Sequence, residues 1–341
     1  MAVIFIYARG LRASAPHSIT NELAPRLRAA FGDVKVYDLS QIATIVPQEG
    51  DILIGHPHQD VRTAFQASIG QRGWKRRAVL CPFSHAHLEL NGWMDQLVEQ
   101  ADLFLAITGK YWFDTMEDSP LSHWKYKTRR LDLAVNPKWF PAVKRGWNAP
   151  GKRKFLYIGY TAPAKGTDYL CQLADANPAL HFGWMGGGFM PTPRVEILGP
   201  SDFNLPESLR LVASFDFIIA CGRSDANPTT LLEGLAWGLV PVCTPQSGYR
   251  NERWLVNIPL DNVEAASAVL QRLNTAPEEE LNAIVARGRA ELERHYTWDR
   301  FGNDVVAALR EPAPSKPTSA EWQERAAANK SLLAEKLGGR K

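Results

Sequence analysis

The segment 215–243 reads FDFIIACGRSDANPTTLLEGLAWGLVPVC and determines the fold that the sequence predicts. Its first part, 215–221, is apolar apart from Asp216 and predicts a buried strand. A polar loop follows, and Pro228 is typical of the first turn of a helix. The apolar run 240–243 then predicts another strand. A strand, a helix and a further strand in this order form a βαβ unit, so the segment indicates a parallel sheet with helices on its faces.

The second half of the chain repeats this alternation, which predicts a doubly wound Rossmann-like domain over residues 152–300. Further apolar runs predict strands at 154–159, 180–184 and 195–198. We expect helices to start at Gly166, Glu207, Thr229 and Asp261, and two more to cover 278–294 and 298–309.

The first half has the same organisation and predicts a Rossmann-like domain over residues 1–145. The predicted strands are 3–7, 34–37, 51–55, 78–81 and 103–107, and Ser18 is the predicted N-cap of the first helix, with Asn21 and Glu22 in its first turn. The Pro- and Gly-rich segment 136–154 is interpreted as a linker. Residues 301–341 are interpreted as a C-terminal helix that packs back on the N-terminal domain, followed by a flexible tail.

The composition excludes several classes of protein. Of the 341 residues, 45% are hydrophobic and 22% are charged, which is typical of globular α/β domains and not of disordered or coiled-coil chains. The four cysteines have no CxxC spacing, which argues against a zinc site or a disulfide framework. Residues 1–150 carry 18 Lys and Arg against 14 Asp and Glu, an excess too small for a dedicated nucleic-acid-binding protein.

The sequence also bears on where the protein resides. Its apolar runs are far shorter than the ~20 residues that a membrane-spanning helix needs. The apolar start of the chain lacks the basic flank and the cleavage site of a signal peptide, so we expect a cytoplasmic protein. Two basic runs, 75–77 and 125–130, are typical of solvated faces. The alternative is peripheral contact of the N-terminal domain with the anionic inner face of a membrane.

Two carboxylates in the opening segment are candidates for chemistry. Asp225 lies in the loop after a predicted strand, and Glu233 lies eight residues later within the predicted helix. The start of that helix offers backbone N–H groups of Thr229 and Thr230 to an anion, and Asn227 is a natural N-cap. Taken alone, two acids at this spacing are typical of unrelated surface charges. The flanking strands and the helix favour a binding site, because open α/β sheets bind ligands at this edge.

With these residues the chain resembles the retaining GT-B glycosyltransferases of the family 4 type. Their signature has an acidic residue, seven others and a Glu, followed by a Gly- or Ala-rich helix and a Pro-Val strand. The resemblance implies that Glu233 binds the ribose hydroxyls of a nucleotide sugar and that Asp225 contacts the sugar ring. The backbone amides after Asn227, at Pro228, Thr229 and Thr230, would surround the diphosphate.

A second match lies at 157–166, which reads YIGYTAPAKG. The resemblance implies that Gly159 allows close approach of the diphosphate and that Lys165 neutralises the charge on the leaving group. Tyr160 stands where the family often has a basic residue, and Arg223 is our candidate for a second cation at the donor.

In the first domain the resemblance points to two loops that follow predicted strands. Gly10 is the candidate in the loop 8–14, at the place of the family's glycine loop. His85 is the leading candidate for the histidine that contacts the donor sugar or the acceptor, with His87 and His56 as alternatives.

The resemblance thus implies two Rossmann-like domains that face a central cleft. The expected reaction moves a sugar from a nucleotide-diphosphate sugar to a hydroxyl of a glycan, a polysaccharide precursor or a lipid-linked saccharide, with retention. The chain contains no Asp-x-Asp, so we expect neither a metal nor another cofactor. Two alternatives remain open: an enzyme like the sugar-nucleotide 2-epimerases, and a non-catalytic GT-B protein that binds nucleotide or glycan.

Overall fold

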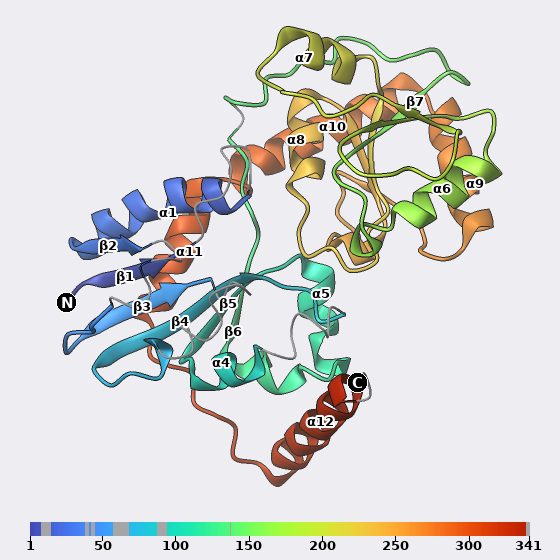
Figure 1. The fold of residues 1–341 in the computed structure, drawn as a ribbon. Coiled ribbons are helices and arrows are strands. Elements are labelled where there is room, and N and C mark those ends of the chain that lie inside the picture. Colours follow the sequence, from blue (N-terminus) through green and yellow to red (C-terminus); the bar gives the residue numbers. More distant parts are fainter. Residues whose placement is uncertain are drawn as a thin grey trace. The chain divides into compact units, whose positions relative to one another are not determined.

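The computed structural model describes residues 1–7, 15–37, 41, 45–56, 68–86, 94–136 and 138–338. The chain divides into two compact units. Unit 1 consists of Met1–Leu133 and Trp298–Lys341, and unit 2 consists of Ala134–Thr297. Each unit is built on one parallel sheet of six strands with helices packed on it (Figure 1). The α/β fold class expected from the sequence is therefore confirmed.

The sheet of unit 1 has the strand order β2-β1-β3-β4-β5-β6, and all neighbours are parallel. The strands are β1 (Val3–Ile6), β2 (Val34–Tyr37), β3 (Asp51–Gly55), β4 (Trp74–Pro82), β5 (Leu103–Ile107) and β6 (Thr128–Leu131). The helices are α1 (Ala15–Phe31), α4 (Asp95–Gln100), α5 (Lys110–Asp114), α11 (Trp298–Arg310) and α12 (Ala320–Gly338), with the 3-10 turns η3 (Thr115–Asp118) and η4 (Ser122–Lys127). The five predicted strands are present.

The predicted start of α1 is wrong. The helix is described from Ala15, so Ser18 lies inside it and not at its N-cap. Pro16 falls in the first turn, where its missing N–H breaks no helical hydrogen bond. The first turn contains no acidic side chain, since Glu22 lies two turns into the helix.

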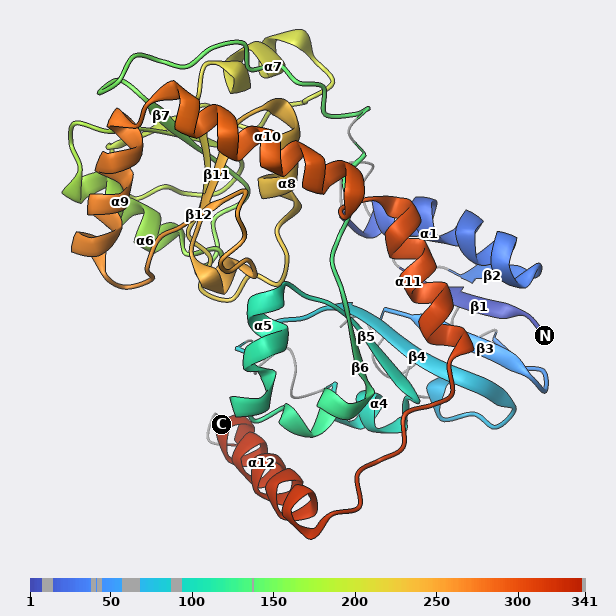
Figure 2. The ribbon, with the colours of Figure 1, turned by 180° about the vertical axis from the view of Figure 1, so that it is seen from behind.

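The C-terminal segment differs from the expected tail. Helix α11 begins at Trp298, as expected for the helix over 298–309, so unit 1 resumes there and not at residue 301. It packs against α1 (Figure 2), where Arg26 Nη2 lies 2.6 Å from Asp299 Oδ1. The chain beyond it was expected to be a flexible tail, but Ala320–Gly338 form the helix α12. Leu333 of α12 is buried in the core of unit 1, and Asn329 donates a hydrogen bond of 2.6 Å to the Ser122 hydroxyl of η4.

The sheet of unit 2 has the strand order β12-β11-β10-β7-β8-β9. Its strands are β7 (Lys154–Ile158), β8 (His181–Met185), β9 (Val195–Ile197), β10 (Phe217–Ala220), β11 (Val240–Cys243) and β12 (Val256–Asn257). Its helices are α6 (Thr167–Ala176), α7 (Pro206–Ala213), α8 (Thr229–Trp237), α9 (Val263–Thr275) and α10 (Glu278–Arg294), with the turns η5 (Pro163–Lys165) and η6 (Pro245–Ser247).

Both faces of the sheet in unit 2 are buried. Along β7, Phe155 and Tyr157 belong to one hydrophobic cluster, whereas Leu156 and Ile158 belong to another. Neighbouring residues of a strand point to opposite faces, so the two clusters are the two sides of the sheet. A central parallel strand buried on both faces is apolar at consecutive positions, which explains why it is recognisable in the sequence.

The two basic runs, 75–77 and 125–130, have side chains that make hydrogen bonds and ion pairs within unit 1. Lys127 is 6% exposed, and its ammonium group donates to three backbone carbonyl groups at the end of α4. Desolvation lowers its pKa to about 8. Arg77 pairs with Asp102 at 3.2 Å, and Arg130 pairs with Asp132 at 2.6 Å. Membrane contact through these runs therefore gains no support. Within the described residues, no helix is both long and apolar enough to cross a membrane.

The described residues of the segment 136–153 form neither helix nor strand, as expected. Residues from Ala134 onward belong to unit 2 and not to the first domain. A buried carboxylate holds the segment in place. Asp216, which is fully buried, lies 2.9 Å from the ammonium nitrogen of Lys144 and accepts hydrogen bonds from the backbone N–H groups of Asn148 and Lys154. Asp216 thus binds the linker to the start of β10. It also gives the backbone N–H groups of Asn148 and Lys154 hydrogen-bond partners.

Replacing Asp216 by Ala is expected to lower the free energy of unfolding of unit 2 by about 3–5 kcal/mol, because it leaves the buried Lys144 ammonium uncompensated. Urea unfolding measures the loss. The control is Glu280→Ala, which removes the exposed Arg272–Glu280 pair and should cost about 1 kcal/mol or less. Equal effects of the two substitutions would contradict a structural role for Asp216.

Candidate active site

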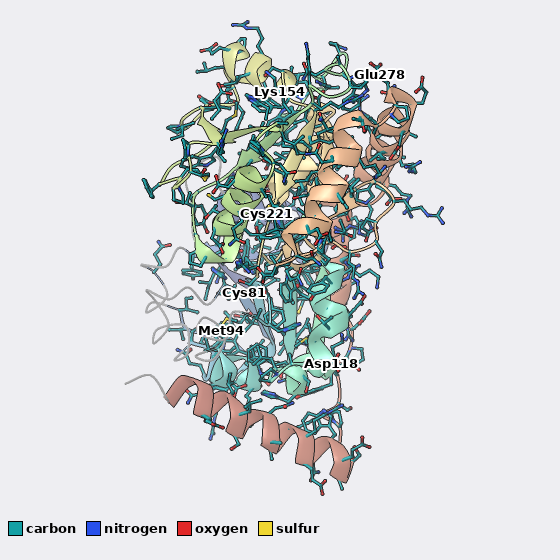
Figure 3. All side chains as sticks on the ribbon, turned by 90° about the vertical axis from the view of Figure 1, so that its right-hand side faces the viewer. Cys81, Met94, Asp118, Lys154, Cys221 and Glu278 are labelled. Carbon is teal, nitrogen blue, oxygen red and sulfur yellow. The ribbon has the colours of Figure 1, made fainter. Side chains whose placement is uncertain are left out.

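The carboxyl ends of the strands in unit 2 carry a set of interlocked loops. Cys221, at the end of β10, marks this edge in Figure 3, and Lys154, at the start of β7, marks the opposite edge. The loop after β8 packs directly on the loop after β7, since a Cβ atom added to Gly186 would lie 1.9 Å from the Gly159 carbonyl oxygen. A side chain at Gly186 is therefore sterically excluded.

The loops after β7 and β10 make an equally close contact. Gly166 has a φ of +63°, and a Cβ atom there would lie 1.8 Å from the Cys221 carbonyl oxygen. The backbone N–H groups of Arg223 and Ser224 both donate to the Ala164 carbonyl oxygen, at 2.9 and 3.2 Å. This backbone contact fixes the position of η5 relative to the start of α8.

The contact brings two of the predicted site residues together. Lys165 Nζ lies 2.7 Å from Asp225 Oδ2, and the two side chains are 24% and 12% exposed. The residues are 60 positions apart in the sequence, so the fold pairs them. The partial exposure leaves the ion pair open to a ligand.

The start of α8 is a candidate anion site. Its N-cap residue is Pro228, and no side chain caps the helix among the described residues. The predicted capping role of Asn227 is wrong, because its side-chain oxygen accepts a hydrogen bond of 3.3 Å from the Tyr249 hydroxyl. The N–H groups at Thr229 and Thr230 lie at the positive end of the helix dipole, which favours an anion.

Glu233 lies one turn into α8 and has an unusual acidity. Burial raises the pKa of its carboxyl group to about 7, and a hydrogen bond with the Thr229 side chain offsets part of this shift. A neutral carboxyl group is both a donor and an acceptor, whereas the ionised form only accepts. Glu233 therefore changes its hydrogen-bonding character around neutral pH.

Arg223 is surrounded by carboxylates before any ligand arrives. Its guanidinium donates to Asp168 at 2.7 Å and to Asp261 at 2.7 Å. The hydrogen bonds to Asp168 raise the pKa of Arg223 above its usual value, with Asp261 as a further cause. A diphosphate would have to compete with both carboxylates for this side chain, so Arg223 is a weaker anion ligand than the sequence suggested.

In unit 1, His85 lies in the loop after β4. Its Nε2 is 2.8 Å from the Thr115 hydroxyl, which itself donates to the Tyr111 carbonyl oxygen at 2.7 Å. Because the hydroxyl proton is used in that bond, His85 Nε2 must be the donor, and the lone pair of the neutral ring is on Nδ1. Burial lowers the pKa of His85 to about 4, so the ring is uncharged at neutral pH.

The other candidates of unit 1 are placed as follows. Gly10 and His87 lie outside the described residues. His56 follows β3, and its ring centroid is 5.1 Å from that of Tyr7. In the part of the chain that the structure describes, no group of three or more His, Cys, Asp or Glu side chains could hold a metal ion.

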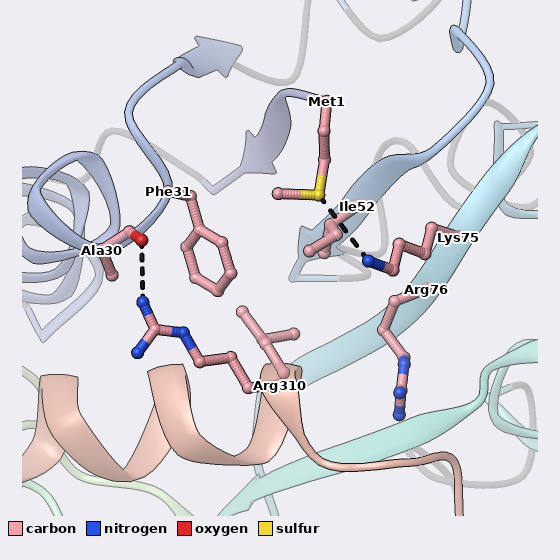
Figure 4. A pocket seen from close by; sticks show the side chains of 8 residues that line it. Met1, Ala30, Phe31, Ile52, Lys75, Arg76 and Arg310 are labelled. Carbon is pink, nitrogen blue, oxygen red and sulfur yellow. Dashed lines mark hydrogen bonds between the residues drawn. The ribbon is translucent and has the colours of Figure 1, made fainter.

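A cavity of about 260 Å³ in unit 1 is distinct from these loops (Figure 4). It lies at the amino ends of β3 and β4, next to Lys75 and Arg76. Arg310 crosses it and donates to the Ala30 carbonyl oxygen at 2.8 Å. Open α/β sheets bind ligands at the carboxyl ends of their strands, so this cavity at the amino ends is not part of the candidate site.

Several contacts of the site have no signal in the sequence. Asp168 and Asp261 are 55 and 38 residues from Arg223, and Thr115 is 30 residues from His85. Pairs at such separations depend on the packing of the loops, and residue type alone does not predict them. The glycines of the site were detectable, because a Gly that directly follows an apolar strand is typical of a close backbone approach.

The chain has the fold of the GT-B glycosyltransferase structures, which confirms the fold expected from the sequence. Sucrose-phosphate synthase from Thermosynechococcus elongatus is similar, with a TM-score of 0.67 and 12% identity over 91% of this chain and 98% of that one. Anabaena HepE in complex with UDP-glucose gives 0.64 and 10% identity over 91% and 99%.

TarM is a further similar structure, with a TM-score of 0.60 and 9% identity. The alignment covers 80% of this chain and 57% of TarM, so the chain spans little more than half of that protein. No family model matches the sequence. No curated protein matches it either. The similarity is thus one of fold.

Gly186→Ala is expected to destabilise unit 2 by about 2 kcal/mol or more, because its Cβ atom would overlap the Gly159 carbonyl group. Gly187→Ala is the matched control, since nothing lies within 4 Å of a Cβ atom at that position, and its effect should stay within about 0.5 kcal/mol. Thermal unfolding of both variants measures the difference. Equal melting temperatures would contradict the interlocked loops.

Glu233→Gln is expected to remove part of the pH dependence of stability. Below pH 4.5 the carboxyl is protonated in both the folded and the unfolded chain, and between pH 4.5 and 7 the unfolded chain ionises first. The wild type therefore loses up to about 3 kcal/mol of unfolding free energy as the pH rises through this window.

Urea unfolding at pH 5 and pH 8 tests this difference. The loss on raising the pH should be smaller in Glu233→Gln than in the wild type. Glu207→Gln, which replaces an exposed carboxyl of α7, serves as the control. Parallel curves for the wild type and Glu233→Gln would refute the raised pKa.

Proposed function

We propose that the protein is a glycosyltransferase that moves a sugar from a nucleoside-diphosphate sugar to a hydroxyl acceptor with retention. The observation that carries the proposal is the partly exposed Lys165–Asp225 ion pair, four residues before the start of α8 on a GT-B fold. A cation, a sugar-binding carboxylate and a helix N-terminus in one place suit the departure of a diphosphate from a sugar.

The diphosphate is bound in unit 2. Its oxygens accept hydrogen bonds from the N–H groups of Thr229 and Thr230 and approach the backbone at Gly159, which has no side chain in the way. The ribose hydroxyls pair with Glu233, one turn further along α8. Each group thus binds a different part of the donor.

Lys165 changes partner during the reaction. In the structure it neutralises Asp225, and a bound diphosphate offers it phosphate oxygens in exchange. The Asp225 carboxylate then accepts hydrogen bonds from the sugar hydroxyls. Negative charge grows on the diphosphate as the glycosidic bond breaks, so the Lys165 ammonium stabilises the transition state more than the bound donor.

In unit 1, we assign a role in sugar binding to His85. A neutral imidazole with its lone pair on Nδ1 accepts a hydrogen bond from a hydroxyl of the donor sugar or of the acceptor. The Thr115 hydroxyl fixes the tautomer and orientation of the ring.

The nature of the donor and the acceptor is part of the proposal. A UDP-sugar is the first donor to test, because HepE was crystallised with UDP-glucose and a Staphylococcus aureus TarM variant with UDP and alpha-GlcNAc-glycerol. We place the acceptor hydroxyl on a glycan, a polysaccharide precursor or a lipid-linked saccharide.

We further propose a metal-independent reaction in the cytoplasm. The four cysteines, all buried and unpaired, support that compartment.

Thermal unfolding with UDP, GDP, ADP and their sugar conjugates tests the proposed donor site. A ligand at ~100 times its dissociation constant adds about 2.7 kcal/mol of stability, which a melting curve detects. The shift should persist with EDTA. No shift with any nucleotide would rule out the donor site. A shift without turnover over a broad set of acceptors would favour a non-catalytic binding protein.

Lys165→Ala is expected to lower kcat by about tenfold or more and to reduce donor affinity less. The reason is that the ammonium group stabilises charge that grows in the transition state. Glu233→Ala should instead weaken nucleotide binding, since ribose is bound in the ground state as well. Lys152→Ala, an exposed lysine of unit 2, is the control. Equal losses of kcat and affinity in Lys165→Ala would contradict the role given to Lys165, and epimerisation of the donor without acceptor would point to an epimerase.

A further inference from the structure

Two large aromatic side chains are exposed at the carboxyl edge of unit 2. Tyr160, in the loop after β7, is 61% exposed, and Phe189, in the loop after β8, is 77% exposed. Most aromatic rings of the described chain are buried, and exposing such a ring forgoes the free energy of its burial. Two exposed rings on adjacent loops therefore indicate a surface that binds something.

Hydrogen bonds fix the backbone around Tyr160, although its ring is exposed. The Tyr157 hydroxyl donates to the Tyr160 carbonyl oxygen at 2.8 Å. The preceding residue, Gly159, accepts a hydrogen bond of 2.7 Å from Trp184 Nε1 and donates to the Met185 carbonyl oxygen at 3.0 Å. The ring is thus presented from a fixed point of the main chain, which reduces the entropy lost on binding.

Phe189 is fixed through the same loop. Its backbone N–H donates to the Thr161 hydroxyl at 3.2 Å, and the next residue, Met190, is buried in the core. Gly188 has a φ of +125°, and a Cβ atom there would lie 2.1 Å from the Thr161 hydroxyl oxygen. Tyr160 and Phe189 therefore belong to one preorganised surface, which we call the aromatic edge.

The aromatic edge adjoins the proposed phosphate site. Lys165 Nζ lies 5.6 Å from the centroid of the Tyr160 ring, and the same ammonium group pairs with Asp225. A ligand with its anionic part at Lys165 can extend a flat ring over Tyr160 or Phe189. This combination of an anion and a flat ring is the chemistry of a nucleotide.

We propose that Tyr160 and Phe189 bind the nucleobase of the donor by stacking. This inference rests on the proposed function, in which the diphosphate and the ribose already have their partners and the base does not. Stacking tolerates different bases, because every base has a flat π-face. The aromatic edge would therefore supply affinity for the nucleoside, and the choice of base would depend on other groups.

Calorimetric titration of the full chain with UDP and with inorganic pyrophosphate tests the proposal. In Tyr160→Ala and in Phe189→Ala, UDP should bind about tenfold more weakly, while the affinity for pyrophosphate stays within about twofold of the wild type because pyrophosphate has no base. Tyr160→Phe keeps the ring and should retain the affinity for UDP. Trp139→Ala is the control, since Trp139 is 56% exposed in the linker segment of the same unit.

Two outcomes would overturn the stacking role alone. One is wild-type affinity for UDP in either alanine variant. The other is an equal loss for UDP and pyrophosphate, which would place the ring at the phosphates or at the loop backbone. A wild-type chain that binds none of UDP, GDP and ADP would overturn the proposed function and the stacking role together. Both side chains are exposed, so the alanine variants are expected to fold, and a melting curve verifies this.

Discussion

The candidate site depends on the close approach of the main chain at Gly166 to the Cys221 carbonyl group. A Cβ atom at Gly166 would lie 1.8 Å from that oxygen, so only glycine permits the contact. The contact holds η5 against the loop after β10 and so sets Lys165 beside Asp225. Side chains could not produce this arrangement alone, because long flexible groups lose conformational entropy when they are ordered. The rigid backbone supplies the order before a ligand binds.

The two cations predicted for the donor site are already paired with carboxylates at this edge. Lys165 is paired with Asp225, and Arg223 is held between two carboxylates. An anion therefore binds by exchanging partners, and the exchange is easier at Lys165, which has one carboxylate partner among the described contacts, than at Arg223, which has two. The backbone amides at the start of α8, which no side chain caps among the described residues, need no such exchange. For this reason the helix N-terminus and Lys165, rather than Arg223, are the natural anchors of a diphosphate.

The sequence predicted the central strands well, because parallel strands buried on both faces are apolar at consecutive positions. The bounds of β3, β5 and β11 agree with the prediction. The edge strands β6 and β12 were missed, since β6 reads Thr-Arg-Arg-Leu and β12 has two residues. The pair of Lys165 and Asp225 was predictable only as two separate motifs. The Asn227 cap failed because its side chain turns to Tyr249, a contact that local sequence does not encode.

Glu233 shows how one half-buried group can serve the fold and the site in opposite ways. Near pH 7 about half of the molecules carry a neutral carboxyl there, since the pKa is about 7. Raising the pH ionises the carboxyl and weakens the fold, because a buried charge is poorly solvated. In the proposed function, the ribose hydroxyls donate hydrogen bonds that favour the ionised form. Nucleotide binding would therefore compensate for the burial of the charge, and the helix that binds the donor would be more stable with its ligand than without it.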